Sequence, residues 1–518
     1  MDTPGTDTSA RHRRRDYGKA AVAGVLAGGL ALGVAEVLAA VIAPTSAPVL
    51  AVGSAFVDAT PTWLKNFAVD TFGTNDKLVL LLGMGITIAL FAAMAGALSL
   101  RRRIIGTVLV GLLGVAAAAA AITRASAGPL DVLPSIVGVV AGAFALDLMV
   151  DRIGDAARRP GSGVDRRSFL TAAGATAAVA ALAGAGGRLL GQATRDVTAS
   201  REALTLPAPA TPAMEPPAGV MAEVEGMPPW QTPNPDFYRI DTALQVPRIN
   251  PADWTLRVHG MVEGEVEVTF DELVAEELVE QWITLTCVSN EVGGDLAGNA
   301  VWLGYPIARL LERARPTDGA DMVLSRSDDG FTAGTPLQAL TDDRGSMLAV
   351  SMNGEPLPLE HGFPVRMVVP GLYGYVSATK WVTEMEVTTY AEKTAYWTDR
   401  GWNAKGPILT ASRIDVPGSF AKLGAGPVVV AGTAWAQHRG ITAVEIQVDD
   451  GDWAPATLAA EATIDTWRQW TYEWDAPSGS HTLRVRATDG EGEMQTEEMA
   501  RPIPSGATGW HSVVVQVA

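Results

Sequence analysis

The run MNGEPLPLEHGFPVRMVVPGLYGYVSATKWVTEMEV (residues 352–387) is the most specific pattern in the chain. Its apolar part, FPVRMVVPG (363–371), is typical of a short strand bounded by turn residues. Arg366 stands inside that part, and the residues alone leave two interpretations: an exposed cation on a strand ladder, or a cation that binds an anion. With Lys380 and nearby loop amides, Arg366 could form an anion-binding cradle.

Short strand-like and helical runs precede this stretch. The predicted strands are WTLRVHG (254–260), EVEVTF (265–270), QWITLTC (281–287) and MVLSRSDDG (322–330). The predicted helices are TFDELVAEEL (269–278), with Thr269 as its N-cap, and YPIARLLERA (305–314). This mixture predicts an α+β domain over residues 230–397.

After residue 398 the pattern changes to alternating strands without a helical period. The predicted strand regions are PVVVAGTAWA (427–436), AVEIQVDDGDWAPATL (443–458), RQWTYEWDAPSGSHTLRVRATD (468–489) and WHSVVVQVA (510–518). Their spacing favours an immunoglobulin-like β-sandwich over residues 398–518. Its simplest role is packing or dimerisation, so a homodimer is one expectation.

Cys287 is the only cysteine of the 518 residues, so it cannot form an internal disulfide. The residues leave three interpretations: an inert small hydrophobe, a free nucleophile or a metal ligand. No Cys–His pair is evident beside it, which makes the nucleophile the weakest of the three. A soft thiolate suits a transition metal.

The N-terminal part, residues 1–191, is predicted to be a transmembrane domain. A helix of about 20 apolar residues crosses a bilayer. The predicted spans are Ala20–Ala43, Leu78–Leu100, Ile104–Ile122, Leu130–Val150 and Phe169–Leu190. The basic segments 11–15, 101–103 and 151–167 fall on one side if the spans alternate. The positive-inside rule therefore predicts a cytoplasmic N-terminus and an extracytoplasmic chain after Leu190.

The junction DRRSFLTAAG (165–174) places Arg166 and Arg167 before Phe169 and Leu170, at the head of the last span. This pattern resembles the twin-arginine export signal, which moves folded, cofactor-loaded domains across a bacterial plasma membrane. The simpler interpretation is a positive-inside anchor. Residues 192–229, rich in proline and alanine, are predicted to be a semi-extended linker.

Two further features limit the function. The net charge of −18 comes mostly from the region after Glu215, which argues against a nucleic-acid partner. None of the six histidines lies in a predicted span, so we expect no haem in this chain. Glu36 is the single acid inside the first three spans; it could contact a partner or quinone, or be a bystander.

Three stretches of the chain closely resemble the sulfite oxidase family of molybdenum enzymes. They are the run 352–387 quoted first, which we call the opening run, PRINPADWTLRVHGMVEGEVEVTFDELV (247–274) and TLTCVSNEVGG (284–294). The resemblance covers about residues 230–518, and the β-sandwich is similar to that family's dimerisation domain. It implies a molybdenum–molybdopterin cofactor whose metal is bound by a cysteine thiolate, at the position of Cys287.

The resemblance also implies the cofactor's other contacts. In the opening run they are His361, Arg366, Ala378, Thr379 and Lys380; in DFYRIDTA (236–243) they are Phe237, Tyr238, Arg239, Asp241 and Thr242; and Asp328 is a further pterin contact. Asn290 is a candidate supporting group beside the cysteine.

The chain departs from the family where sulfite-oxidising members bind their anion. Ile240 and Val292 stand where those members have arginines, and Trp402 stands near the position of their tyrosine. Losing two cations removes much of the field that would bind a dianion. Sulfite is therefore a doubtful substrate, and no cytochrome b5-like domain is present to accept electrons.

We therefore expect an outward-facing, membrane-anchored molybdenum oxidoreductase that transfers an oxygen atom or two electrons. Its substrate would be a small molecule or a sulfoxide, including oxidised methionine in proteins, and its electron partner a separate cytochrome or quinone. Two alternatives stay open: a sulfite dehydrogenase with an altered anion site, and a non-catalytic membrane scaffold. The scaffold is disfavoured because Cys287, Arg366 and Lys380 are all retained.

Overall fold

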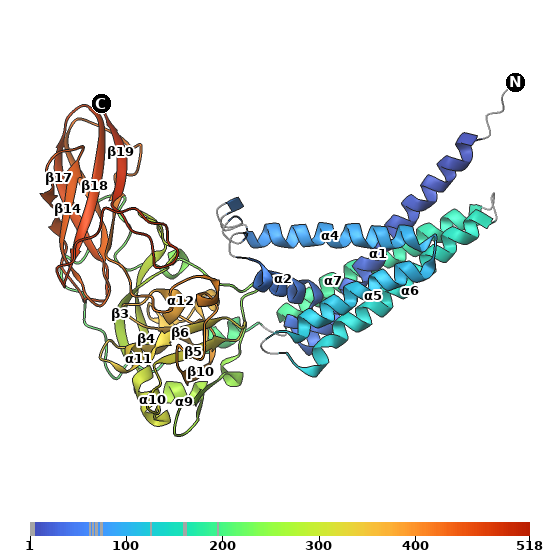
Figure 1. Cartoon of the computed structure of the whole chain (residues 1–518), viewed down its shortest axis with the longest axis horizontal. Coiled ribbons are helices and arrows are strands. Elements are labelled where there is room, and N and C mark those ends of the chain that lie inside the picture. Colours follow the sequence, from blue (N-terminus) through green and yellow to red (C-terminus); the bar gives the residue numbers. More distant parts are fainter. Residues whose placement is uncertain are drawn as a thin grey trace. The chain divides into compact units, whose positions relative to one another are not determined.

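A computed structural model describes residues 6–61, 64, 67, 71–72, 76–124, 127–158, 163–193 and 196–518. The chain divides into two compact units. The first runs up to Asp196 and includes Ala243–Gln245; the second holds Val197–Thr242 and Val246–Ala518. Figure 1 shows helices in the first unit and mainly strands in the second.

The first unit is a bundle of apolar helices. Its helices are α1 (Thr6–Ile42), α2 (Pro48–Ala59), α4 (Asp76–Ser99), α5 (Arg103–Ile122), α6 (Leu133–Arg158) and α7 (Gly163–Ala193). Five candidate spans have the length and hydropathy needed to cross a membrane: Arg15–Ile42, Lys77–Ser99, Arg103–Ile122, Pro129–Ile153 and Arg167–Gly191. These match the five predicted spans closely, which confirms the helical membrane bundle.

Helix α1 packs closely on its neighbours through small residues. A Cβ added at Gly24 would collide with the carbonyl of Ala92 in α4, and one at Gly33 would crowd the carbonyl of Ala180 in α7. Large apolar side chains such as Leu82 instead face outward from the bundle. This arrangement is typical of helices that pack in lipid, where small residues let backbones approach.

The α+β domain of the second unit contains two five-stranded sheets. One has the order β2-β1-β10-β5-β6; the other has the order β3-β4-β7-β8, with β9 paired to β7. The strands are β1 (Thr255–Gly260), β2 (Val266–Thr269), β3 (Val279–Thr286), β4 (Ala297–Pro306), β5 (Met322–Ser327), β6 (Thr332–Pro336), β7 (Met347–Met352), β8 (Glu355–Pro356), β9 (Arg366–Val368) and β10 (Val382–Thr388). The helices are α9 (Phe270–Ala275), α10 (Ile307–Ala314), α11 (Leu337–Thr341) and α12 (Gly374–Ser377).

Local sequence explains these boundaries. Thr269 caps α9 as predicted: its Oγ1 accepts from the Glu272 N–H, and the Glu272 side chain accepts from the Thr269 N–H. The helix ends at Ala275, earlier than predicted, because the chain must enter β3 at Val279. Fully buried Trp254, Trp302 and Trp381 fill the interior of the domain.

The C-terminal domain is a β-sandwich, as predicted. Its sheets have the orders β11-β13-β17-β16 and β12-β19-β18-β14-β15. The strands are β11 (Ala411–Val416), β12 (Lys422–Leu423), β13 (Gly426–Trp435), β14 (Ile441–Val448), β15 (Ala454–Pro455), β16 (Thr457–Leu458), β17 (Arg468–Ala476), β18 (Gly479–Asp489) and β19 (His511–Val517). Alternating apolar residues of both sheets, including Val430, Trp470 and Val485, form one core.

The region predicted to be a linker is extended but bound to the second unit. After the short helix α8 (Thr198–Ala203), Ala210 donates to the Leu278 carbonyl and Thr211 accepts from Glu280, both at 2.8 Å. Further along, Gly219 accepts from Ala460 at 2.9 Å. The segment therefore lies against both domains rather than acting as a free spacer, because its peptide groups pair with the edges it passes.

Candidate functional site

Cys287 begins a tight loop at the end of β3. Its N–H donates to the Leu296 carbonyl at 2.9 Å, and its carbonyl accepts from Asn290 at 3.1 Å. The Asn290 side chain accepts from the Leu296 N–H at 2.9 Å, which closes the loop. Cys287 Sγ lies 2.9 Å from Ser289 Oγ. Cys287 is buried, and burial raises the pKa of its thiol.

Arg366 is a buried cation, not an exposed ladder residue. It is 5% exposed, its Nη1 donates to the His361 carbonyl at 3.1 Å, and its guanidinium lies 5.1 Å from the centroid of the Trp302 ring. Among the described residues no carboxylate neutralises it, and burial lowers its pKa to about 10. An unpaired buried cation is costly unless an anion accompanies it.

His361 lies directly beside this cation. Its Nε2 is 3.3 Å from the Asn234 carbonyl oxygen, and its ring packs edge-on against Phe237 with centroids 5.6 Å apart. Burial, followed by the charges of Arg366 and Lys380, lowers the pKa of His361 to about 3. The imidazole is therefore neutral at ordinary pH, and its single N–H lies on Nε2, where it donates to the Asn234 carbonyl.

Lys380 adds a second buried cation next to Arg366, to which it is joined by an antiparallel bridge. Its Nζ lies 3.0 Å from both Asp241 Oδ2 and the Glu360 carbonyl oxygen. Burial lowers the pKa of Lys380 to about 8, partly offset by Asp241. Arg239 Nε also donates to Asp241, at 2.9 Å. Two cations therefore share one carboxylate, and net positive charge remains.

Most of the other predicted cofactor residues surround this cluster. Phe237 and Tyr238 stack with ring centroids 5.3 Å apart. Tyr238 is half-buried; burial and then the charge of Cys287 raise its pKa, while Arg366 lowers it.

The other predicted cofactor residues form hydrogen bonds within the domain, through their backbone or through their side chains. Asp328 donates its N–H to the Trp381 carbonyl at 2.9 Å, and Thr242 Oγ1 lies 3.4 Å from Asp329. The Ala378 N–H donates to the Gly374 carbonyl at 2.9 Å. Thr379 is fully buried with its hydroxyl 2.7 Å from Ser325 Oγ, so its side chain is already occupied within the domain.

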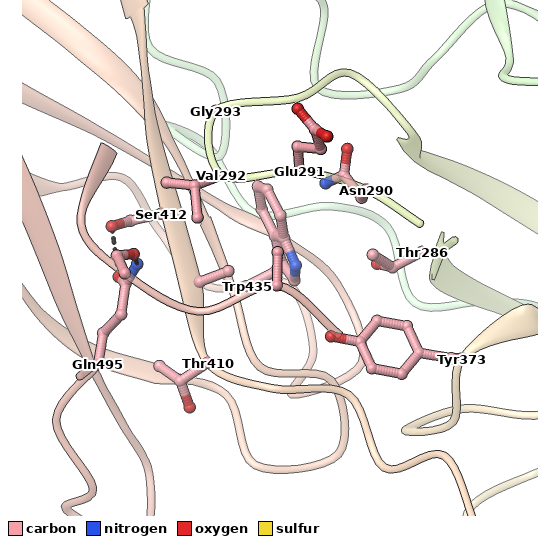
Figure 2. A pocket seen from close by; sticks show the side chains of 13 residues that line it. Thr286, Asn290, Glu291, Val292, Gly293, Tyr373, Thr410, Ser412, Trp435 and Gln495 are labelled. Atoms are coloured by element: carbon pink, nitrogen blue, oxygen red, sulfur yellow. Dashed lines mark hydrogen bonds between the residues drawn. The ribbon is translucent and has the colours of Figure 1, made fainter. Parts of the chain in front are cut away.

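A small cavity lies next to the cysteine loop, between the α+β domain and the β-sandwich (Figure 2). Its volume is about 20 Å³, enough for about one water molecule or one ligand oxygen atom. Its lining residues are Thr286, Asn290, Glu291, Val292, Gly293, Tyr373, Thr410, Ala411, Ser412, Trp435, Gln495, Ala507 and Gly509. The lining contains no lysine or arginine.

Two aromatic polar groups border this cavity, and sequence reasoning missed both as site residues. Trp435 Nε1 is buried without a hydrogen-bond partner among the described residues. Burial raises the pKa of Tyr373 to about 12, and Cys287 adds to this, so its hydroxyl stays protonated. Tyr373 lies in the opening run and could have been suspected from its position; nothing in the sandwich sequence marked Trp435.

The three positions at which the chain departs from the sulfite-oxidising members lie in different parts of the structure. Val292 lines the cavity, whereas Ile240 is 48% exposed. Trp402 packs against Tyr375 and Trp397, with ring centroids 5.8 and 6.3 Å away. Its Nε1 is buried without a partner among the residues described.

The cluster fits an anionic cofactor. Arg366 and Lys380 match the cationic donors that a phosphate-bearing group requires. The described part of the chain contains no group of three or more His, Cys, Asp and Glu residues arranged for a metal.

Comparisons with known proteins point the same way. Residues 243–397 match the model of the oxidoreductase molybdopterin binding domain family. Mitochondrial sulfite oxidase from Mus musculus is 29% identical over 340 residues, covering 55% of this chain and 61% of that protein. The uncharacterized oxidoreductase YuiH from Bacillus subtilis (strain 168) is 32% identical over 153 residues, covering 30% of this chain and 74% of that protein.

Among solved structures, the sulfane dehydrogenase SoxCD from Paracoccus pantotrophus matches with a TM-score of 0.51 and 23% identity. The match covers 57% of this chain and 85% of that one, and it shows the shared fold. The chain spans less than two thirds of the length of the sulfite oxidases it matches, 61% of the mouse protein and 64% of the Rattus norvegicus protein.

Proposed function

Because this chain belongs to the sulfite oxidase family of molybdopterin-dependent oxidoreductases, we propose that it is a membrane-anchored enzyme that reduces a neutral, oxygen-bearing small molecule or sulfoxide. Cys287 is its metal ligand. The observation that carries the proposal is a buried thiol, Cys287, in the same domain as Arg366, a buried cation with no carboxylate partner among the described residues; both affect the pKa of Tyr238.

The cofactor would be held at both of its ends. Arg366 and Lys380 would bind the phosphate, with the neutral His361 packed beside Arg366, and Cys287 would bind the metal. Tyr238, whose pKa both Cys287 and Arg366 affect, would contact the pterin. When bound, the cofactor supplies the two-electron change and the place where an oxygen atom is exchanged.

The charge of the cavity supports a neutral substrate. Its lining has no lysine or arginine, so a sulfite dianion would meet no counter-charge there. A sulfoxide carries no net charge and has one strong acceptor oxygen. The protonated Tyr373 hydroxyl and the unpartnered Trp435 N–H are donors suited to that oxygen.

The overall reaction then balances simply. The substrate's S–O bond breaks, the sulfur is reduced by two electrons to a thioether, and the oxygen leaves as water after taking up two protons. Tyr373 and Trp435 orient the oxygen, and the closed Cys287 loop fixes the metal. The electrons come from a separate cytochrome or from quinone.

The membrane unit supports an outward-facing catalytic domain. Basic segments at 11–15, 101–103 and 151–167 all lie on the cytoplasmic side when five spans alternate, and the second unit follows the last span. Arg166 and Arg167 would serve as the export signal; the Arg166 side chain lies outside the described residues. The C-terminal domain could additionally form a homodimer.

A sulfite dehydrogenase is the second candidate, favoured by the sulfite oxidases among its relatives. One screen separates the two. Purified full-length protein is supplied with a reduced viologen dye and dimethyl sulfoxide, methionine sulfoxide or trimethylamine N-oxide, and separately with ferricyanide and sulfite. We expect Cys287-dependent turnover with an S- or N-oxide and none with sulfite. Turnover with sulfite alone would replace the proposal with the second candidate.

A further inference from the structure

The C-terminal β-sandwich contacts the two ends of the cysteine loop directly. β3 is an edge strand of its sheet, so its outer peptide groups need partners. The sandwich supplies them at Thr284: the Thr284 N–H donates to the Asp465 carbonyl at 2.9 Å, and the Thr284 carbonyl accepts from Gln437 Nε2 at 3.1 Å. Thr284 lies shortly before Cys287 in the chain.

Gln437 makes a second contact even nearer the cysteine. The same Nε2 donates to Thr286 Oγ1 at 2.8 Å, and Thr286 immediately precedes Cys287. Gln437 is fully buried. One amide group from the sandwich therefore fixes both the backbone and a side chain at the start of the loop.

Arg413 fixes the other end of the loop. Its Nη1 donates to the Gly294 carbonyl at 2.9 Å, while its Nε donates to Asp415 Oδ1 at 2.7 Å. Asp415 in turn accepts from Thr433 Oγ1 at 2.6 Å. Because the buried Arg413 and the partly buried Asp415 neutralise each other, the contact to Gly294 is positional rather than a charge directed at a substrate.

The ring of His511 completes the contact. Gly293 has a φ of 79°, and a Cβ at this residue would collide with the His511 ring. His511 Nδ1 accepts from the Ile414 N–H at 3.0 Å, so the ring is held by the sandwich itself. The loop from Cys287 to Gly294 is thus enclosed by residues of the C-terminal domain at both of its ends.

We propose that the C-terminal domain sets the position of the Cys287 thiol, with Gln437 and Arg413 as positioning residues. The domain is then a structural part of the metal site, in addition to any role in dimerisation. The consequence for turnover rests on the proposed function, because it requires Cys287 to bind the metal; the consequence for the thiol itself does not.

The test compares variants of the two positioning residues, which we call seam variants because Gln437 and Arg413 lie where the two domains meet, with matched variants elsewhere in the C-terminal domain. Gln437→Glu keeps the shape but removes the donor, and Arg413→Lys keeps the charge but cannot bridge Asp415 and Gly294. The controls are Gln469→Glu, at a fully buried glutamine that donates to the Pro228 carbonyl, and Arg468→Lys, at an arginine that donates to the Ala459 and Ile441 carbonyls. Thermal unfolding is measured for all four.

Two readouts report the position of the sulfur. The first is the alkylation rate of Cys287, the only thiol, by iodoacetamide in full-length protein made in a host without pterin synthesis. The second is the molybdenum EPR spectrum of the cofactor-loaded protein, with kcat and KM. Losing a buried hydrogen bond should raise the alkylation rate about tenfold in the seam variants. Their EPR spectrum should shift, and kcat should fall more than KM rises.

The controls should match wild type in both readouts even where their unfolding temperature falls equally. Seam variants that are indistinguishable from the controls in alkylation rate would overturn the proposal. If the wild-type protein binds no molybdenum, the proposed function fails, yet the alkylation comparison still decides whether the C-terminal domain positions the thiol.

Discussion

Arg366 Nη1 donates to the backbone carbonyl oxygen of His361 at 3.1 Å, so a buried cation and a buried neutral imidazole are fixed side by side. The hydrogen bond uses only part of the guanidinium, which has five donors. The remaining donors have no carboxylate among the described residues to neutralise them. This relationship is what an anionic cofactor would require, and it sets the first prediction.

Arg366→Gln should cause loss of the cofactor while leaving the fold intact. The change removes a charge-assisted contact worth about 1.5–3 kcal/mol, so retention should weaken about 10- to 100-fold. Pterin fluorescence after gel filtration measures it. Arg344→Gln is the control, because Arg344 donates to the Pro370 carbonyl at 3.1 Å but pairs with Asp342. Equal pterin content in both variants would contradict the assigned role of Arg366.

Val292→Arg should shift the substrate preference towards sulfite. The cavity beside Cys287 contains no cation, and an arginine there would supply one to an anion. We expect kcat/KM for sulfite to rise at least about tenfold, equivalent to about 1.4 kcal/mol. Val292→Gln is the neutral control of similar reach. A rise of the same size with glutamine would show that charge is not the cause.

Tyr373→Phe should lower kcat for an S-oxide about tenfold with little change in KM, because a donor to the substrate oxygen is lost. Tyr375→Phe is the matched control. Burial raises the pKa of both tyrosines to about 12, yet Tyr375 donates to the Asn403 carbonyl at 2.7 Å and does not line the cavity. Steady-state kinetics on both variants decide whether the cavity hydroxyl is used.

Asp489 should control the acid stability of the C-terminal domain. Burial would raise the pKa of Asp489, but hydrogen bonds from Arg439 and Thr410 outweigh it and hold the pKa below 3.8. A carboxyl with a lowered folded-state pKa stabilises the fold above the unfolded-state value, and this contribution is lost as the pH falls through the folded-state pKa.

Asp489→Asn should therefore cost about 3 kcal/mol at neutral pH, because it leaves a partly buried guanidinium unpaired. The difference from wild type should shrink as the pH falls below 3.8, because the carboxyl protonates first in the unfolded chain and, at still lower pH, in the folded protein. Urea unfolding at several pH values measures this. A constant difference at all pH values would contradict the role of the ion pair.

Much of the fold was predictable because its signals are local. The apolar spans and the Thr269 capping box depend on residues close together in the chain, and both were confirmed. The strand predicted over FPVRMVVPG is shorter in the structure, where β9 covers only Arg366–Val368. The predicted linker pairs with strand edges that its own sequence could not reveal.

The residues of the candidate site likewise fall into those that the sequence could indicate and those that only the folded structure reveals. Cys287, Arg366 and Lys380 were singled out because their residue types and a family pattern mark them. Trp435, Gln437 and Arg413 reach the cysteine loop only through packing of the sandwich, far away in sequence, and no local pattern predicts such contacts. Trp402 stays a predicted site residue; in the described structure it packs against Tyr375 and Trp397.

The most direct test of the central claim is the molybdenum and pterin content of the purified full-length protein, measured together by plasma mass spectrometry and pterin fluorescence. Cys287→Ser is measured in parallel. The account predicts equimolar molybdenum and pterin in the wild-type chain and loss of the sulfur ligand from the metal's X-ray absorption spectrum in the variant. A folded wild-type chain that contains neither molybdenum nor pterin would contradict it.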